Sequence, residues 1–157
     1  MPEAIDTSLI VRPVQPMDFS MWLPLWDGYN AFYGRHGDTA LAAAITQTTW
    51  QRFFDANEPV FALVAHRRGQ LVGLVHYLFH RSTTRIEPTC YLQDLFTAPA
   101  ARRGGVGQAL IEGVYRQAAS AGVPHVYWQT HVGNATGRRL YDRVATHAGF
   151  IVYQHDA

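Results

Sequence analysis

Hydrophobic positions in the first third of the chain follow a helical period. Between residues 16 and 34, apolar side chains recur four positions apart, as at Trp22 and Trp26, which predicts a helix. Pro24 is expected to break or kink this helix, because proline lacks the amide proton of the helical ladder. A second helix is predicted over residues 38–57, beginning at an aspartate and ending near an asparagine.

The pattern then changes to that of strands. Residues 60–80 are predicted to form two apolar strands around a tight turn at residues 67–70. Another strand is expected over residues 89–98, where Pro99 stops it. A short strand over residues 8–15 precedes the first helix. Three consecutive strands in the middle of the chain are typical of an antiparallel meander.

The last third alternates helices and strands again. Val106, Leu110 and Val114 fall on one face of a helix that Gly122 ends. A strand over residues 125–132, a helix over 134–149 and a last strand over 150–154 are predicted to follow. Strand–helix–strand succession indicates a parallel crossover, so the expected fold is α/β, with a mixed sheet flanked by helices.

Composition limits the range of functions. The chain of 157 residues, 48% of them hydrophobic, is long enough for one domain with a sizeable core, which we expect to span residues 1–157. A net charge of +1 gives no support for nucleic acid or an anionic membrane as partner. The single cysteine, Cys90, excludes an internal disulfide. With no signal-like leader and no apolar run of about 18 residues, the protein is expected to be cytoplasmic.

The most unusual stretch is "RRGGVGQALI", residues 102–111, in which three glycines precede a helix. A helix N-terminus carries unpaired N–H groups and partial positive charge, and glycines let phosphate oxygens approach them. Arg102 and Arg103 add charge beside the loop. The stretch lacks the Lys-Ser/Thr pair of a P-loop and the spacing of a dinucleotide fingerprint. It indicates a diphosphate site, with a flexible basic turn as the alternative.

Two linked motifs suggest a family. Residues 102–107 fit the pattern Arg/Gln-x-x-Gly-x-Gly/Ala, and "NATGRRLYDRVATHAGF", residues 134–150, contains Asn134 and Tyr141 at the matching spacing, with Gly137 where alanine is usual. This combination resembles the GNAT N-acetyltransferase superfamily. The stretches "GYNAFYG" and "YWQTH" are similar to the branch with histone-, polyamine- and D-amino-acid-acetylating members. The resemblance implies a mostly antiparallel sheet of about six to seven strands with about four helices.

The resemblance also implies acetyl-CoA as co-substrate and a binding site along one strand and the glycine loop. Free backbone groups at the end of the strand over residues 89–98 would pair with the pantetheine, the loop would hold the pyrophosphate, and an asparagine would contact the cofactor arm. The residues implied are Leu95, Phe96, Thr97, Arg102, Arg103, Gly104, Gly105, Val106, Gly107, Gln108 and Asn134.

The expected reaction is direct attack of an amine on the thioester in a ternary complex. Tyr141 is the candidate general acid for the leaving sulfur, with a buried core aromatic as the alternative. Many members of the family use a glutamate as base. This chain offers Asp94, whose pKa burial would raise, and His131, which titrates in a useful range. A water chain without a dedicated base is the third alternative.

The acceptor is expected to be a primary amine of a small molecule or a peptide. By resemblance, the first two helices and the loop before residue 89 line its site, where Trp26, Tyr29, Tyr33 and Glu87 could hold a cationic amine. Core packing is the alternative for the aromatic residues, and simple solvation for the glutamate. No metal site is expected, because His76 and His80 have no further ligands at useful spacing.

A catalytically silent acyl-CoA-binding module is the alternative function. Related proteins often pair through their last strand, so the resemblance also suggests a homodimer built through residues 150–154.

Overall fold

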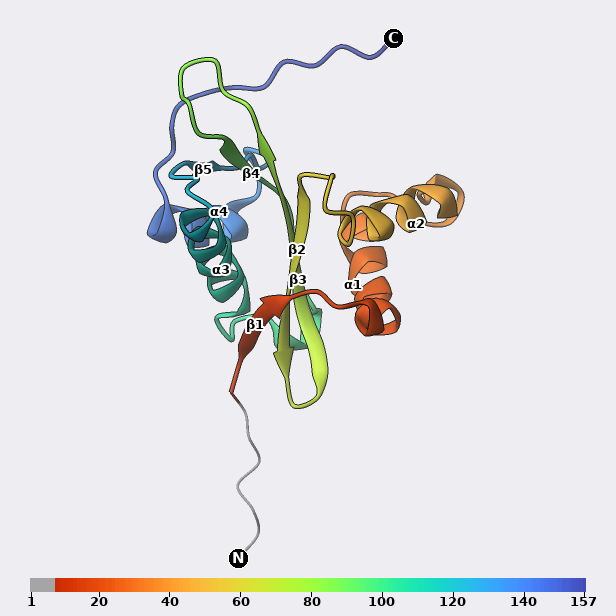
Figure 1. Ribbon diagram of the computed structural model, residues 1–157. Coiled ribbons are helices and arrows are strands. Elements are labelled where there is room, and N and C mark those ends of the chain that lie inside the picture. Colours follow the sequence, from red (N-terminus) through yellow and green to blue (C-terminus); the bar gives the residue numbers. More distant parts are fainter. Residues whose placement is uncertain (1–7) are drawn as a thin grey trace, which may run out of the picture.

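In the part of the chain that the structure describes, a five-stranded sheet carries helices on both faces (Figure 1). The computed structural model describes residues 8–157. The strands lie in the order β1-β2-β3-β4-β5, antiparallel except for the parallel pair β4 and β5. The strands are β1 (Ile10–Pro13), β2 (Val60–Arg67), β3 (Gln70–His80), β4 (Thr89–Thr97) and β5 (Val126–Tyr127). The helices are α1 (Phe19–Phe32), α2 (Ala43–Arg52), α3 (Val106–Ser120) and α4 (Ala135–Val144).

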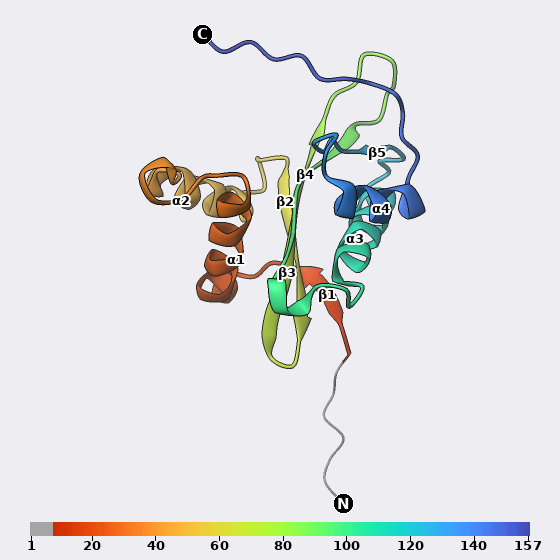
Figure 2. The ribbon, with the colours of Figure 1, turned by 180° about the vertical axis from the view of Figure 1, so that it is seen from behind.

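The sheet separates two hydrophobic cores. On one face, α1 buries Trp22 and Leu25 against Val64 and Leu74. On the other face, α3 packs its apolar side against β2, β3 and β4 (Figure 2). Alternate residues of β2 serve the two cores, as the two-residue period of a strand requires.

The β2–β3 hairpin forms as predicted. Arg68 and Gly69 connect the strands with φ of 52° and 76°, which is the left-handed backbone of a tight hairpin turn. Glycine adopts such a φ without steric cost, and the arginine adopts it with some strain.

Strand β4 contains a bulge that changes which face its side chains occupy. Opposite β3, Asp94 pairs with His76 and Leu92 pairs with Tyr77, so that Gln93 is an extra residue without a partner. Before the bulge, Leu92 packs into the α3 core. After it, Phe96 packs into the α1 core. Because of the extra residue, Asp94 points to the α1 face; regular alternation from Leu92 would turn it to the α3 face.

Strands β4 and β5 separate soon after they meet. They pair only at Cys90 with Val126 and Tyr91 with Tyr127, while β4 continues to Thr97. Within residues 8–157, the β4 edge beyond Tyr91 therefore has no strand beside it, so its backbone groups could pair with a ligand.

Several expected boundaries were wrong. Pro24 does not break α1, because the loss of one hydrogen bond is offset by buried residues on both sides of it. The second helix is shorter than expected, with a separate 3₁₀ turn at Gly37–Thr39. The fifth strand has two residues, and α4 ends at Val144.

The predicted last strand is absent, which leaves the sheet with five strands. Residues 145–157 have no regular structure, and Phe150, Ile151, Val152 and Tyr153 are all exposed. Figures 1 and 2 both show this segment running away from the body. The apolar pattern typical of a strand is present, but β5 is too short to pair with it over its length.

Candidate active site

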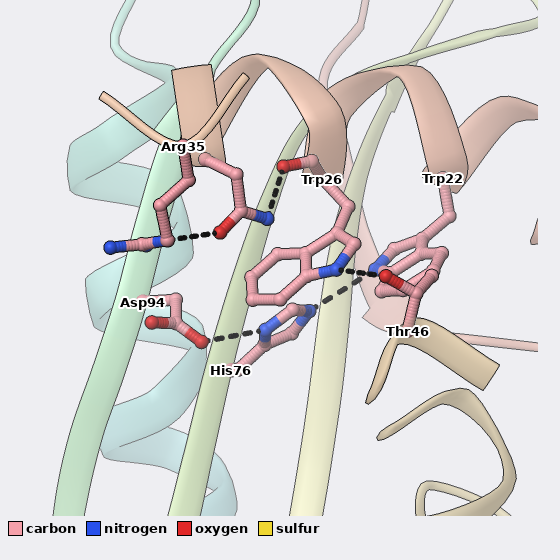
Figure 3. A network of polar contacts seen from close by, with 7 residues as sticks. Trp22, Trp26, Arg35, Thr46, His76 and Asp94 are labelled. Atoms are coloured by element: carbon pink, nitrogen blue, oxygen red, sulfur yellow. Dashed lines mark hydrogen bonds and ion pairs between the residues drawn. The ribbon is translucent and has the colours of Figure 1, made fainter. Parts of the chain in front are cut away.

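A chain of buried polar groups connects α1, β3 and β4 (Figure 3). The Trp22 indole N–H donates to His76 Nε2 over 3.1 Å, and His76 Nδ1 lies 2.9 Å from Asp94 Oδ2. Because an indole nitrogen can only donate, Nε2 of His76 must accept, and its proton sits on Nδ1 and is donated to Asp94. His76 is thereby held as the neutral tautomer, and it fixes the orientation of the Asp94 carboxylate.

Asp94 also acts on Tyr29 of α1. Burial, then the charge of Asp94 and a hydrogen bond to it, raise the pKa of Tyr29. The Tyr29 hydroxyl therefore stays protonated and donates to the carboxylate. Asp94 is buried, and His76 and Tyr29 are its two hydrogen-bond donors. Such donors offset the cost of burying a carboxylate beside a cavity.

Two cavities meet beside Asp94. The larger, about 670 Å³, lies between α1, α2 and the sheet and is lined by Trp26, Arg35, His76 and Asp94 among others. The smaller lies in the opening between β4 and β5, where Leu95, Trp128 and Tyr141 line it. The residues that line both cavities are Tyr29, Gln93 and Gln129.

Tyr141 of α4 reaches the smaller cavity. Its ring packs edge-on against Trp128 with 5.5 Å between the ring centroids. Burial, and then the neighbouring Tyr33, raise the pKa of Tyr141. The hydroxyl is therefore protonated throughout the neutral range, as a proton donor must be.

The glycine loop has the geometry of an anion site. Gly105 is the N-cap of α3 with φ of 79°, and no side chain caps this helix end. A Cβ on Gly105 would meet no atom within 4 Å, so there is open space beside this residue. A Cβ on Gly107 would lie 3.1 Å from Leu140 of α4, so the second glycine allows close packing of the two helices. Uncapped amides beside an open space fit a diphosphate.

Arginines surround this loop. Arg103 adopts a left-handed φ of 67° within it, and Arg102 donates from Nε to the Thr97 carbonyl at 3.3 Å. Arg67, at the end of β2, donates from Nη2 to the Gly104 carbonyl at 3.4 Å. The buried Nε of Arg67 has no hydrogen-bond partner among residues 8–157. Arg67 could not be singled out from the sequence, because it lies 37 residues before Gly104.

Asn134 organises the start of α4. Its Oδ1 accepts from the Gly137 amide at 3.2 Å, and its Nδ2 donates to Thr130 at 3.0 Å. A Cβ at residue 137 would overlap the Asn134 amide group. Glycine in place of the usual alanine therefore allows this cap, which is the physical consequence of the departure from the family pattern.

The remaining predicted residues divide into two groups. Trp26 and Tyr29 line the larger cavity, and Tyr33 lines the smaller one. His131 and Glu87 are not brought to either cavity. His131 is in the loop before α4, where its Nδ1 accepts from the Gly133 amide, and Glu87 lies 4.0 Å from Arg85 in the β3–β4 connection.

Sequence reasoning missed two residues at this site. The sequence pattern considers His76 only as a metal ligand, whereas in the sheet it lies directly opposite Asp94. Arg35 was not considered, because it lies in the loop after α1 and only folding brings it over the cavity.

Residues 8–157 contain no cluster of side chains able to hold a metal ion. No helix in this part of the chain is long and apolar enough to cross a membrane.

The sequence pattern of the acetyltransferase (GNAT) family matches residues 22–145. Since this is most of the chain, the chain belongs to that family, and it is an acetyl-CoA-dependent N-acetyltransferase. This confirms the resemblance inferred from the two motifs.

Known proteins agree with this assignment. HPA3 of Saccharomyces cerevisiae (strain ATCC 204508 / S288c), a D-amino-acid N-acetyltransferase, is 31% identical over 154 residues, covering 97% of this chain and 93% of the yeast protein. YhfO of Bacillus subtilis (strain 168), an uncharacterized N-acetyltransferase, is 26% identical, covering 91% and 94%. The structure of AAC(6')-Iy with a bisubstrate analogue has a TM-score of 0.81 at 14% identity, covering 96% and 99%, and shows the same fold.

Replacing Gly105 by alanine tests the diphosphate site. Gly105→Ala forces a left-handed φ on an L-residue, so the loop amides shift, and the dissociation constant of CoA should rise about tenfold, because charged hydrogen bonds are lost. Isothermal titration calorimetry with CoA measures this.

Gly122→Ala is the matched control. Gly122 has φ of +73° and open space around it, but lies past the other end of α3. Both variants should lose about 1 kcal/mol of unfolding free energy, whereas only Gly105→Ala weakens CoA binding. Equal CoA affinity in the two variants would contradict the assignment.

Proposed function

We propose that this enzyme acetylates the primary amine of a small molecule bound in the larger cavity, by direct attack within a ternary complex. The observation that carries the proposal is the meeting of the two cavities, with a carboxylate on one and a phenol on the other. The name of the yeast relative, a D-amino-acid N-acetyltransferase, also favours a small acceptor.

Asp94 is the base in this proposal. An alkyl ammonium of pKa about 10.4 must lose a proton before its nitrogen can attack. Asp94 accepts that proton at its carboxylate, while His76 and Tyr29 hold the group in place. His131 is poorly placed for the same role, since its Nδ1 is already an acceptor in an exposed loop.

Tyr141 is the acid. Tyr141 lines the cavity between β4 and β5, and its hydroxyl stays protonated because burial raises its pKa. Tyr141 donates its proton to the departing sulfur, and the second proton released from the acylated nitrogen restores it. The net reaction thus releases one proton to solvent, the one that Asp94 takes from the ammonium.

Bound acetyl-CoA supplies the thioester whose acetyl group is transferred and whose sulfur leaves as a thiol. The unpaired edge of β4 at Leu95, Phe96 and Thr97 would hold the pantetheine, with the amides of residues 103–108 around the pyrophosphate. The Phe96 side chain itself belongs to the α1 core, so its contribution would come from the backbone.

The test of the proposed function is acetyl-CoA-dependent release of free thiol across a panel of amines. D- and L-amino acids, polyamines, aminoglycosides and lysine-rich peptides cover the acceptor classes. Turnover with a small amine supports the proposal. Folded protein that binds CoA but releases no thiol with any amine would favour the silent acyl-CoA-binding module.

Removing the Tyr141 hydroxyl tests its role as acid. Tyr141→Phe should lower kcat about 100-fold or more, because general acid catalysis of this kind contributes that much, with little change in CoA affinity. Steady-state thiol release measures kcat. Tyr153→Phe, at an exposed tyrosine in the C-terminal segment, is the control and should match the wild type. Equal kcat in both variants would exclude Tyr141 as the acid.

We also propose that two copies form a dimer through the C-terminal segment. Its apolar run of Phe150, Ile151, Val152 and Tyr153 is exposed, and β5 lies at the edge of the sheet. An apolar extended segment and an open edge are complementary. The segment of one copy would lie against the other copy beside β5, which would bury the four apolar side chains.

Ile151→Lys combined with Val152→Lys should convert the dimer to a monomer, because charges disfavour burial of the segment. Sedimentation equilibrium of the full chain measures the mass. The control is Met17→Lys, at another exposed apolar residue. A wild-type monomer at micromolar concentration would contradict the proposed dimer.

A further inference from the structure

The acceptor cavity carries a cation that the chemistry described above does not use. Arg35 lines the larger cavity together with Asp94. Both charges act on the same phenol, because Asp94 raises the pKa of Tyr29 while Arg35 acts to lower it. The two charged side chains therefore lie near one another across the cavity, and Figure 3 shows both beside Trp26.

Arg35 is held in a defined position. Its Nε donates to Asn30 Oδ1 at 2.7 Å, and Asn30 in turn donates from Nδ2 to the Trp26 carbonyl at 2.9 Å. Asn30 is only 4% exposed, so this anchor is part of the core. The guanidinium also lies over the rings of Tyr29 and Tyr33, at 5.8 and 5.5 Å from their centroids.

This arrangement leaves one edge of the guanidinium available. The bond to Asn30 uses Nε, and no carboxylate in residues 8–157 lies within ion-pair distance of Arg35. Asp94 is itself engaged by His76. A preorganised guanidinium with a free edge is the group that proteins use to recognise a carboxylate.

We propose that Arg35 binds the carboxylate of the acceptor, so that the acceptor class is an α-amino acid; this rests on the proposed function. Asp94 and Arg35 then receive the two opposite charges of one zwitterion, the ammonium at Asp94 and the carboxylate at Arg35. Polyamines and aminoglycosides place a second cation toward Arg35 and are selected against by repulsion.

The test compares each amino acid with its carboxamide, in which the negative charge is missing but the amine and side chain remain. Phenylalanine and phenylalaninamide, each as D- and L-enantiomer, are assayed by thiol release with wild type and with Arg35→Gln. The quantity measured is the ratio of kcat/KM for acid over amide. The two α-amines differ in pKa, but this difference is the same for every variant and cancels when ratios are compared.

Arg35→Gln should lower the acid-to-amide ratio about 10- to 100-fold, because a charged hydrogen-bonded contact is lost for the acid alone. Arg35→Lys should restore part of it. The matched control is Arg52→Gln, which removes another arginine from the lining of the same cavity. Arg52 is half exposed and lies 4.0 Å from Glu58, so its removal should leave the ratio unchanged.

Loss of activity on acid and amide by the same factor in Arg35→Gln would overturn the proposal and assign Arg35 to support of the tyrosines. Turnover of polyamines above amino acids by the wild type would also overturn it. If no amine is turned over, the proposed function fails, and calorimetry of phenylalanine with CoA-bound protein still decides the binding role. Binding by wild type but not by Arg35→Gln supports the anchor, and equal or absent binding in both overturns it.

Discussion

The extra residue in β4, Gln93, is the constraint on which the rest of the site depends. It reverses the alternation of side chains, so that Asp94 leaves the α3 core and faces α1, where His76 and Tyr29 receive it. A buried carboxylate is costly unless donors surround it, and the Trp22–His76 chain supplies one in a fixed tautomer. The bulge and the Trp22–His76 hydrogen bonds together hold a carboxylate at the wall of the larger cavity, where we propose that it acts as the base.

The same strand also forms part of the proposed acetyl-CoA site. Beyond Tyr91, β4 has no partner strand on the β5 side in the described part of the chain, and it leads directly to the glycine loop and the uncapped end of α3. Strand β4 thus connects a carboxylate on one face with an open backbone edge and an anion site at its end. Tyr141 of α4 lines the smaller cavity. This cavity shares Tyr29, Gln93 and Gln129 with the larger one.

Local features of the fold could be predicted, and features that depend on distant parts of the chain could not. The turn at Arg68–Gly69 and the glycine loop are set by backbone preferences within a few residues, and both occur where the pattern placed them. The last strand failed because a strand needs a partner as well as an apolar pattern, and β5 is only two residues long. The sequence identifies Asp94 as a candidate base. The bulge that turns its side chain toward α1 can be recognised only from the pairing of β4 with β3.

Arg35 and His76 could not be predicted as site residues for the same reason, because their roles depend on distant parts of the chain. Neither belongs to a motif, and each is defined by neighbours far along the chain, such as Trp22 for His76. His131 and Glu87 were candidates only because their side chains can bind a proton or a cation. In the folded chain, neither lines the larger or the smaller cavity. Residue type and motif therefore suffice to make the glycine loop a candidate cofactor site, whereas Arg35 and His76 become candidates only in the tertiary structure.

The most direct test of this account is the turnover of Asp94→Asn, which preserves shape and hydrogen bonding to His76 but cannot take a proton. The account predicts a fall in kcat/KM for the acceptor of about 100-fold or more, with unchanged affinity for CoA. Asp142→Asn, at an exposed position of α4, is the matched control and should behave as wild type. Turnover of Asp94→Asn close to that of the wild type would show that the carboxylate beneath the acceptor cavity is not the base.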